Sequence, residues 1–173
     1  MVNPKLAVAL TGRSGEALEE YKKLMLKLNN EVVAAAPEDL LINTHVCRGN
    51  YHSTFFSSGA YDSVADLLFG EENVNAYYLE YDDERSGGFA PLAKVSGDKK
   101  VVLGLVTTKT PALENKELVI NRIHEAAKYV PLDILYLSPQ CGFASCEIGN
   151  KLTEEEQWAK LKLVKEIAEE VWG

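Results

Sequence analysis

Residues 100–107 read KVVLGLVT, a short run that is apolar almost without interruption. Such a run is typical of a strand in a parallel sheet that is covered on both faces. Three other segments have the same character: 40–47 (LLINTHVC), 75–81 (NAYYLEY) and 133–138 (DILYLS). The sequence therefore predicts four buried strands.

Helical patterns precede, separate and follow these strands. The expected helices have apolar stripes over residues 18–32, 61–69, 118–130 and 158–171. The last helix begins with a capping box formed by Thr153 and Glu156. Residues 86–96 are rich in glycine and leave room for one helical turn. This alternation of strands and helices predicts an α/β fold with a parallel sheet and right-handed crossovers.

The size and charge of the chain exclude several classes of protein. A length of 173 residues predicts one domain over 1–173, with a leading helical segment at 1–39 and four strand–helix units at 40–173. The net charge of −8 argues against nucleic acid as a partner, and no apolar run approaches the roughly 20 residues of a membrane span. Three cysteines are too few for a disulfide framework. We therefore expect a cytoplasmic protein with reduced thiols and no membrane partner.

Two architectures have this order of elements. A flavodoxin-like or Rossmann-like open sheet fits the chain length, but no glycine-rich phosphate loop follows any predicted strand. A TIM (β/α)8 barrel typically needs about 250 residues, so this chain would supply about half of one. Length favours the open sheet, whereas the residues at the strand ends favour the half-barrel.

Metal-binding side chains stand at the carboxyl ends of three predicted strands, where the active sites of parallel α/β folds lie. His45 and Cys47 end the first strand, Glu80 ends the second, and Cys141 follows the fourth. Residues i and i+2 of a strand point to the same face, so His45 and Cys47 can reach one ion together. Two thiolates, an imidazole and a carboxylate suit Zn²⁺. A core histidine beside a buried thiol is the alternative, because His-x-Cys alone is a weak motif.

Other residues are weaker candidates for metal ligands. Cys146 is more simply a small, partly buried thiol than a fifth ligand. The run DDER at 82–85 is expected to form local ion pairs in a solvated loop, close to the site because it follows Glu80. His52 and His124 have no ligand partner nearby in the sequence.

Four motifs, in this order, resemble the C-terminal catalytic barrel of cobalamin-independent methionine synthase. They are THVCRGNYHS (44–53), YYLEYDDERSG (77–87), VVLGLVTTKTP (101–111) and LSPQCGFAS (137–145). They look closest to the shorter, single-barrel 5-methyltetrahydropteroyltriglutamate–homocysteine methyltransferase-like proteins, and the resemblance runs from about Leu18 to Gly173. It implies zinc-dependent methyl transfer from 5-methyltetrahydrofolate, or another methyl donor, to homocysteine or a similar thiol, giving methionine.

The resemblance also implies roles for individual residues. The zinc ligands would be His45, Cys47, Glu80 and Cys141, with Glu80 as the labile ligand that an incoming thiolate displaces. Lys109 stands where methionine synthases carry a histidine that helps proton transfer to the folate, so Glu80 and Lys109 are the expected catalytic residues. Lysine is a poorer proton donor near neutral pH, and a solvated loop lysine is the alternative. The expected substrate contacts are Asp82, Asp83, Ser138 and Gln140.

The resemblance begins near the fourth helix of the barrel, so the first four strands have no counterpart in this sequence. Four strands cannot close a barrel, and an isolated half would expose two sheet edges and a large apolar surface. Either a complementary half-barrel chain or a second copy in a homodimer is therefore the expected partner, or the chain is a fragment. The alternative function is a non-catalytic zinc-binding half-barrel, and a flavin-binding open sheet is a third.

Overall fold

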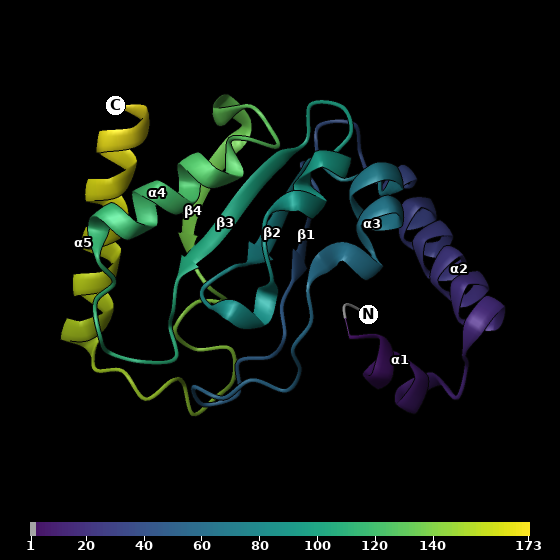
Figure 1. The fold of residues 1–173 in the computed structure, drawn as a ribbon, viewed down its shortest axis with the longest axis horizontal. Helices are drawn as coiled ribbons and strands as arrows, with labels where there is room; N and C mark the ends of the chain where they lie inside the picture. Colours follow the sequence, from purple (N-terminus) through teal and green to yellow (C-terminus); the bar gives the residue numbers. More distant parts are fainter. Residues whose placement is uncertain (1–2) are drawn as a thin grey trace.

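The computed structural model describes residues 3–173. Its centre is one sheet of four parallel strands in the order β1-β2-β3-β4 (Figure 1). The strands are β1 (Asn43–Val46), β2 (Ala76–Glu80), β3 (Lys100–Val106) and β4 (Leu135–Pro139). The predicted α/β architecture with four parallel strands is confirmed, and among the described residues β1 and β4 are the edges of the sheet.

Within the described residues, five α-helices and four short 3-10 helices accompany the strands. The α-helices are α1 (Pro4–Thr11), α2 (Gly15–Ala34), α3 (Ala65–Glu71), α4 (Lys116–Ala126) and α5 (Glu154–Trp172). The 3-10 helices are η1 (Tyr61–Ser63), η2 (Glu84–Ser86), η3 (Ala90–Lys94) and η4 (Leu132–Ile134). The predicted helix at 61–69 is thus divided into η1 and α3, and the glycine-rich stretch at 86–96 contains η3 and the last residue of η2.

Helix α1 was not expected, because the sequence pattern indicated a single leading helix. Its start is nevertheless specified locally: Asn3 Oδ1 accepts a hydrogen bond from the backbone N–H of Leu6 at 3.0 Å, and Pro4 occupies the first helical position. Gly12 ends the helix in the left-handed conformation, with φ of 66°.

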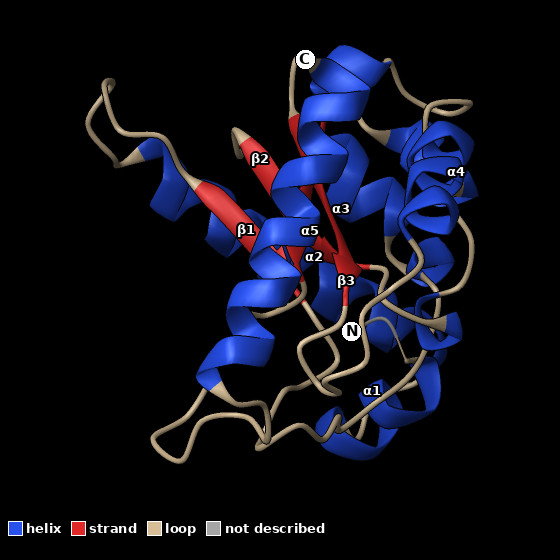
Figure 2. Cartoon of the chain, turned by 90° about the vertical axis from the view of Figure 1, so that its left-hand side faces the viewer, coloured by secondary structure: helices blue, strands red, loops and turns tan. Residues whose placement is uncertain are grey.

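The hydrophobic core lies between one face of the sheet and the helices. Its fully buried members include Tyr77 and Leu103 from the sheet, Phe69 from α3, Ile123 from α4 and Ile167 from α5. Figure 2 shows α4 to one side of the strands and β1 at the other. The helices pack against this face of the sheet, and the loops that follow the strands gather at their carboxyl ends.

Residues 3–173 leave part of the opposite face of the sheet uncovered. Tyr78 of β2 and Tyr136 of β4 alternate with core residues, and each is 40% exposed. Together with Lys100 and Val102, they line a pocket of about 350 Å³ at the amino ends of the strands. Along the apolar stripe expected on α2, Leu18 alone is fully buried. These surfaces are the ones that an isolated half-barrel is expected to expose.

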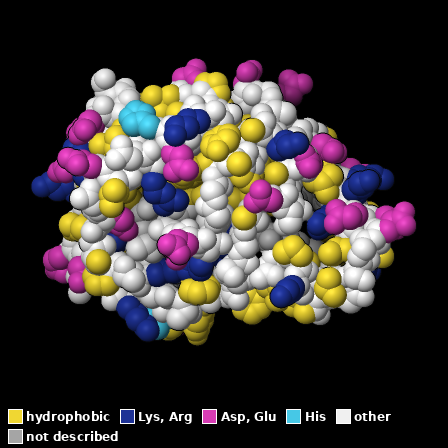
Figure 3. Space-filling view, in the orientation of Figure 1, with side chains coloured by type: hydrophobic (Ala, Val, Ile, Leu, Met, Phe, Trp, Pro, Cys, Tyr) yellow, Lys and Arg dark blue, Asp and Glu magenta, His cyan; other side chains and the backbone are white. Residues whose placement is uncertain are grey.

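The molecular surface carries both signs of charge. On the face seen in Figure 3, acidic and basic side chains are interspersed with apolar ones rather than gathered into a continuous basic surface. No helix within residues 3–173 is both long enough and apolar enough to cross a membrane.

Candidate metal centre

The loops that follow the two edge strands meet at the carboxyl end of the sheet. Neighbouring strands are about 4.8 Å apart, so the edges of a flat four-stranded sheet would be separated by about 14 Å. The two loops bridge this distance (Figure 1). Asn50 Nδ2 donates hydrogen bonds to Gly142 O at 3.1 Å and Ser145 Oγ at 2.9 Å, and the N–H of Ser53 donates to Asn150 Oδ1 at 3.2 Å.

This arrangement places three of the predicted metal ligands together. His45 Nε2 lies 3.3 Å from Cys141 Sγ, and the ligand atoms of His45, Cys47 and Cys141 all lie within 4.8 Å of one another. Cys141 has a left-handed backbone, with φ of 53°. That conformation costs a residue with a Cβ about 1–2 kcal/mol, and such strain is concentrated at functional sites.

Protons in this group are shared unequally. A hydrogen bond with Cys141, supported by another with His45, lowers the pKa of Cys47 to about 4. The contact with Cys47, together with burial, raises the pKa of Cys141, and the contact with Cys47 also raises the pKa of His45. These contacts favour the thiolate form of Cys47, and a cation would be attracted to such a group.

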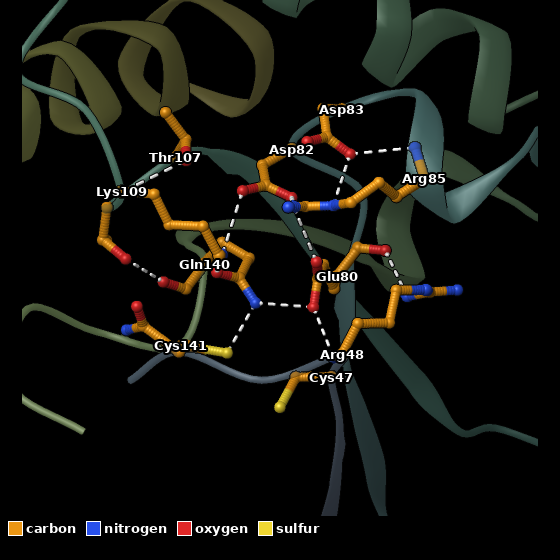
Figure 4. Close-up of polar contacts among 12 residues, drawn as sticks. Cys47, Arg48, Glu80, Asp82, Asp83, Arg85, Thr107, Lys109, Gln140 and Cys141 are labelled. Carbon is orange, nitrogen blue, oxygen red and sulfur yellow. Dashed lines mark hydrogen bonds and ion pairs between the residues drawn. The ribbon is translucent and has the colours of Figure 1, made fainter. Parts of the chain in front are cut away.

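The fourth predicted ligand, Glu80, lies beside this group rather than in it. Its carboxylate is fully buried, and each oxygen faces hydrogen-bond donors. Oε2 accepts from the backbone N–H of Arg48 at 2.6 Å and from Gln140 Nε2 at 2.9 Å, while Oε1 pairs with Arg85 Nη2 at 2.9 Å. Burial raises the pKa of Glu80, and the N–H of Arg48 opposes that shift. Gln140 also donates to Cys141 Sγ and so connects Glu80 to the three donors (Figure 4).

Lys109 is held close to the same network. Its ammonium group donates to Gln140 Oε1 and lies 3.4 Å from Asp82 Oδ2. The side chains of Lys109 and Asp82 are only 7% and 1% exposed, and Asp82 also pairs with Arg85 at 3.1 Å. Asp82 is thus a buried member of an ion-pair network instead of a solvated loop residue.

The remaining predicted site residues differ in position. Ser138 lines a pocket of about 230 Å³ with His45, Tyr78 and Cys141 on the open side of the sheet. Asp83 is exposed, and its Oδ1 lies 2.9 Å from Arg85 Nε and accepts from the backbone N–H of Arg85. Ser138 therefore lies beside the group of three candidate donors, whereas Asp83 contacts Arg85 in the neighbouring loop.

Comparison with known proteins fits this geometry. Residues 17–170 match the family described as "Cobalamin-independent synthase, Catalytic domain". The chain belongs to this cobalamin-independent synthase family.

Relatives of this synthase-family chain are longer than it is. The uncharacterized Bacillus subtilis protein YxjG is 53% identical over 159 residues, which are 91% of this chain and 42% of YxjG. The methionine synthase of Pyrococcus horikoshii is 29% identical over 101 residues, 58% of this chain and 26% of that protein. The chain therefore spans less than half the length of the curated relatives it matches.

A solved structure from the synthase family has the same fold. The putative vitamin-B12 independent methionine synthase from Listeria monocytogenes matches 94% of this chain and 43% of its own, with a TM-score of 0.70 and 37% identity. The predicted fold, half of a barrel of the methionine synthase type, is confirmed, and the flavodoxin-like alternative is excluded.

Arg48 is a site residue that sequence reasoning missed in this synthase-family chain. It is 2% exposed, and its guanidinium donates to Gly59 O at 2.9 Å and to Tyr61 OH at 3.0 Å, besides the contact of its backbone N–H with Glu80. Its position in the sequence could have indicated this role. A charged residue that directly follows a predicted ligand at the end of a buried strand is expected to be buried, and a buried charge needs hydrogen-bond or ion-pair partners.

Gly104 of β3 leaves room for the turn that carries Gln140. A Cβ at this position would lie 2.8 Å from Leu79 O and 3.3 Å from Gln140 Cα. Gly104→Ala is therefore expected to lower the free energy of unfolding, measured by urea denaturation, by about 1–3 kcal/mol.

The matched control is Gly70→Ala in α3, where a Cβ would have its nearest neighbour at 3.9 Å. Alanine is the better helix former, so this variant should be at least as stable as the wild type. Equal unfolding free energies for the two variants would show that the close approach at Gly104 is unimportant.

Proposed function

We propose that this chain is the zinc-binding half of a (β/α)8 methyltransferase. Methyl transfer would run from 5-methyltetrahydrofolate, or another methyl donor, to homocysteine or a similar thiol, giving methionine. The observation that carries this proposal is the group of three donors, His45, Cys47 and Cys141, from the two edges of the sheet. Family membership supports the reaction class.

The donor set fits zinc. Zn–S bonds of about 2.3 Å and Zn–N bonds of about 2.0 Å in a tetrahedral site separate a nitrogen and a sulfur ligand by roughly 3.5 Å. His45 Nε2 and Cys141 Sγ are 3.3 Å apart. Two sulfurs and one imidazole are the soft and borderline donors that zinc prefers to oxygen-binding cations.

The ion and Glu80 would have different roles in the reaction. A bound zinc ion would lower the pKa of a substrate thiol, whose ordinary value is about 8.5. Glu80 is proposed as the fourth ligand and as the one that the substrate thiol displaces, since Arg48, Arg85 and Gln140 already provide hydrogen bonds for its carboxylate.

The substrate would approach from the open side of the sheet. Ser138 lines the pocket there and is proposed to contact the substrate. Asp82, Asp83 and Gln140 were expected to do the same. In this structure each is engaged with Arg85 or Lys109, so we propose that they contact the substrate while bonded to these cations.

The uncovered face and the free edges of the sheet need a partner. We propose a complementary half-barrel, with a second copy of this chain as the other candidate, because four strands cannot close a barrel. Free thiols at all three cysteines are consistent with the reducing conditions of the cytoplasm, where we propose the protein works.

The test is a complementation assay. Zinc-loaded chain is mixed with the portion of YxjG that lies outside the match, together with homocysteine and 5-methyltetrahydrofolate, and methionine is measured. We expect methionine only when both polypeptides are present and none with Cys141→Ser. Other methyl donors are assayed in parallel.

Zinc binding without methionine from any donor would contradict the methyltransferase proposal. That result would favour the alternative, a non-catalytic zinc-binding half-barrel.

A further inference from the structure

The side-chain amide of Gln140 lies at the centre of the polar network. Gln140 is 1% exposed. Its Oε1 accepts a hydrogen bond from Lys109 Nζ, and its Nε2 donates to Glu80 Oε2 at 2.9 Å and to Cys141 Sγ (Figure 4). One amide therefore contacts a buried cation on one side and two predicted metal ligands on the other.

The neighbours of this amide permit only one orientation. An ammonium group can only donate, so the atom of Gln140 that faces Lys109 must be the oxygen. The Glu80 carboxylate already faces the N–H groups of Arg48 and Arg85 as an acceptor, so the atom that faces it must be the nitrogen. A flipped amide would place NH₂ against the ammonium and oxygen against the carboxylate.

Lys109 is itself fixed. Asp82 Oδ2 lies 3.4 Å from its ammonium, and the backbone N–H of Lys109 donates to Thr107 Oγ1 at 3.2 Å. Asp82 is in turn paired with Arg85 at 3.1 Å. The cation is therefore held against Gln140 by other groups of the chain.

We propose that Lys109 and Gln140 form a positioning pair for the metal centre. Lys109 fixes the amide of Gln140, and the amide N–H groups then reduce the electron density on the Cys141 sulfur and restrain Glu80 beside the three donors. Partners behind the ligands of metal sites commonly tune them in this way. Lys109 would thus act through Gln140, a role different from the proton transfer that the family resemblance implied for it, and the inference rests on the proposed zinc site.

The test replaces zinc by Co²⁺, whose thiolate-to-metal charge-transfer absorption reports the electron density on the sulfur ligands. Lys109→Met and Gln140→Met should each shift this band to longer wavelength, because a sulfur without the N–H donor is more easily oxidised. Zinc affinity, measured by chelator competition, should fall about tenfold. Lys109→Arg, which keeps a donor, should retain the wild-type band.

A double variant separates this role from a general structural one. Since Lys109 is inferred to act through Gln140, the combined variant should show the shift of Gln140→Met alone. The matched control is Lys116→Met, because Lys116 pairs with Glu170 on the surface, and this variant should leave the band unchanged.

The outcomes distinguish the inference from the proposed function. No thiolate band in the wild type would overturn the metal site and the positioning pair together. A wild-type band that Lys109→Met does not move, or shifts that add in the double variant, would overturn the positioning pair and leave the metal site standing.

Discussion

Cys141→Ser is expected to remove zinc from this protein. Wild-type protein purified without added metal should contain about one zinc ion per chain, and the variant close to none. The serine hydroxyl does not ionise at neutral pH, so the site loses one of its two sulfur ligands and the atom that lies 3.3 Å from His45 Nε2. Zinc per chain, measured by elemental analysis, is the readout.

Cys146→Ser is the matched control. Cys146 is half-buried in the loop that begins at Cys141, and it is not one of the three grouped donors. This variant should retain the zinc content of the wild type. Folded wild-type protein that takes up no zinc, even from added metal, would refute the site.

Glu114→Ala is expected to destabilise the fold more than any other substitution considered. Lys160 of α5 is completely buried, and its ammonium group bonds to both carboxylate oxygens of Glu114 at 3.1 Å and to Ala112 O at 2.7 Å. Removal of the carboxylate leaves a buried cation with one neutral acceptor. We expect the free energy of unfolding in urea to fall by about 3 kcal/mol.

Two further variants test the cause of that loss. Glu114→Gln keeps an oxygen for Lys160 and should cost less than Glu114→Ala. Glu170→Ala removes the exposed partner of Lys116 and should cost less than about 1 kcal/mol. A loss at Glu114→Ala no larger than that at Glu170→Ala would show that the burial of Lys160 does not matter.

The strands could be predicted because buried strands of a parallel sheet consist of continuous apolar runs. The first strand was nevertheless predicted too long: it begins at Asn43, and Leu40 and Leu41 before it are 55% and 75% exposed. Leu28 and Val32 of α2 are likewise 44% and 72% exposed although they belong to an apolar stripe. An apolar pattern indicates that a face is suited to burial. It does not show whether the residues that would bury that face belong to this chain.

That three candidate donors, His45, Cys47 and Cys141, would lie together could be predicted from their residue types and from their places at the ends of strands. Their supporting partners could not, since those contacts join distant segments. Arg48 meets Glu80 across 32 residues, and Gln140 meets Glu80 across 60. The orientation of the Gln140 amide depends on Lys109 and Glu80, which lie far from it in the sequence, so no local sequence pattern predicts it.

The separation of the edge loops along the chain also bears on the order of events during synthesis. His45 and Cys141 are 96 residues apart, so the complete donor group exists only after the segment between them has left the ribosome. Contacts of such long range form slowly, because a large loop must close first. Under the proposed assignment, metal uptake would be a late step, and a nascent or incompletely folded chain would present only the weak pair formed by His45 and Cys47.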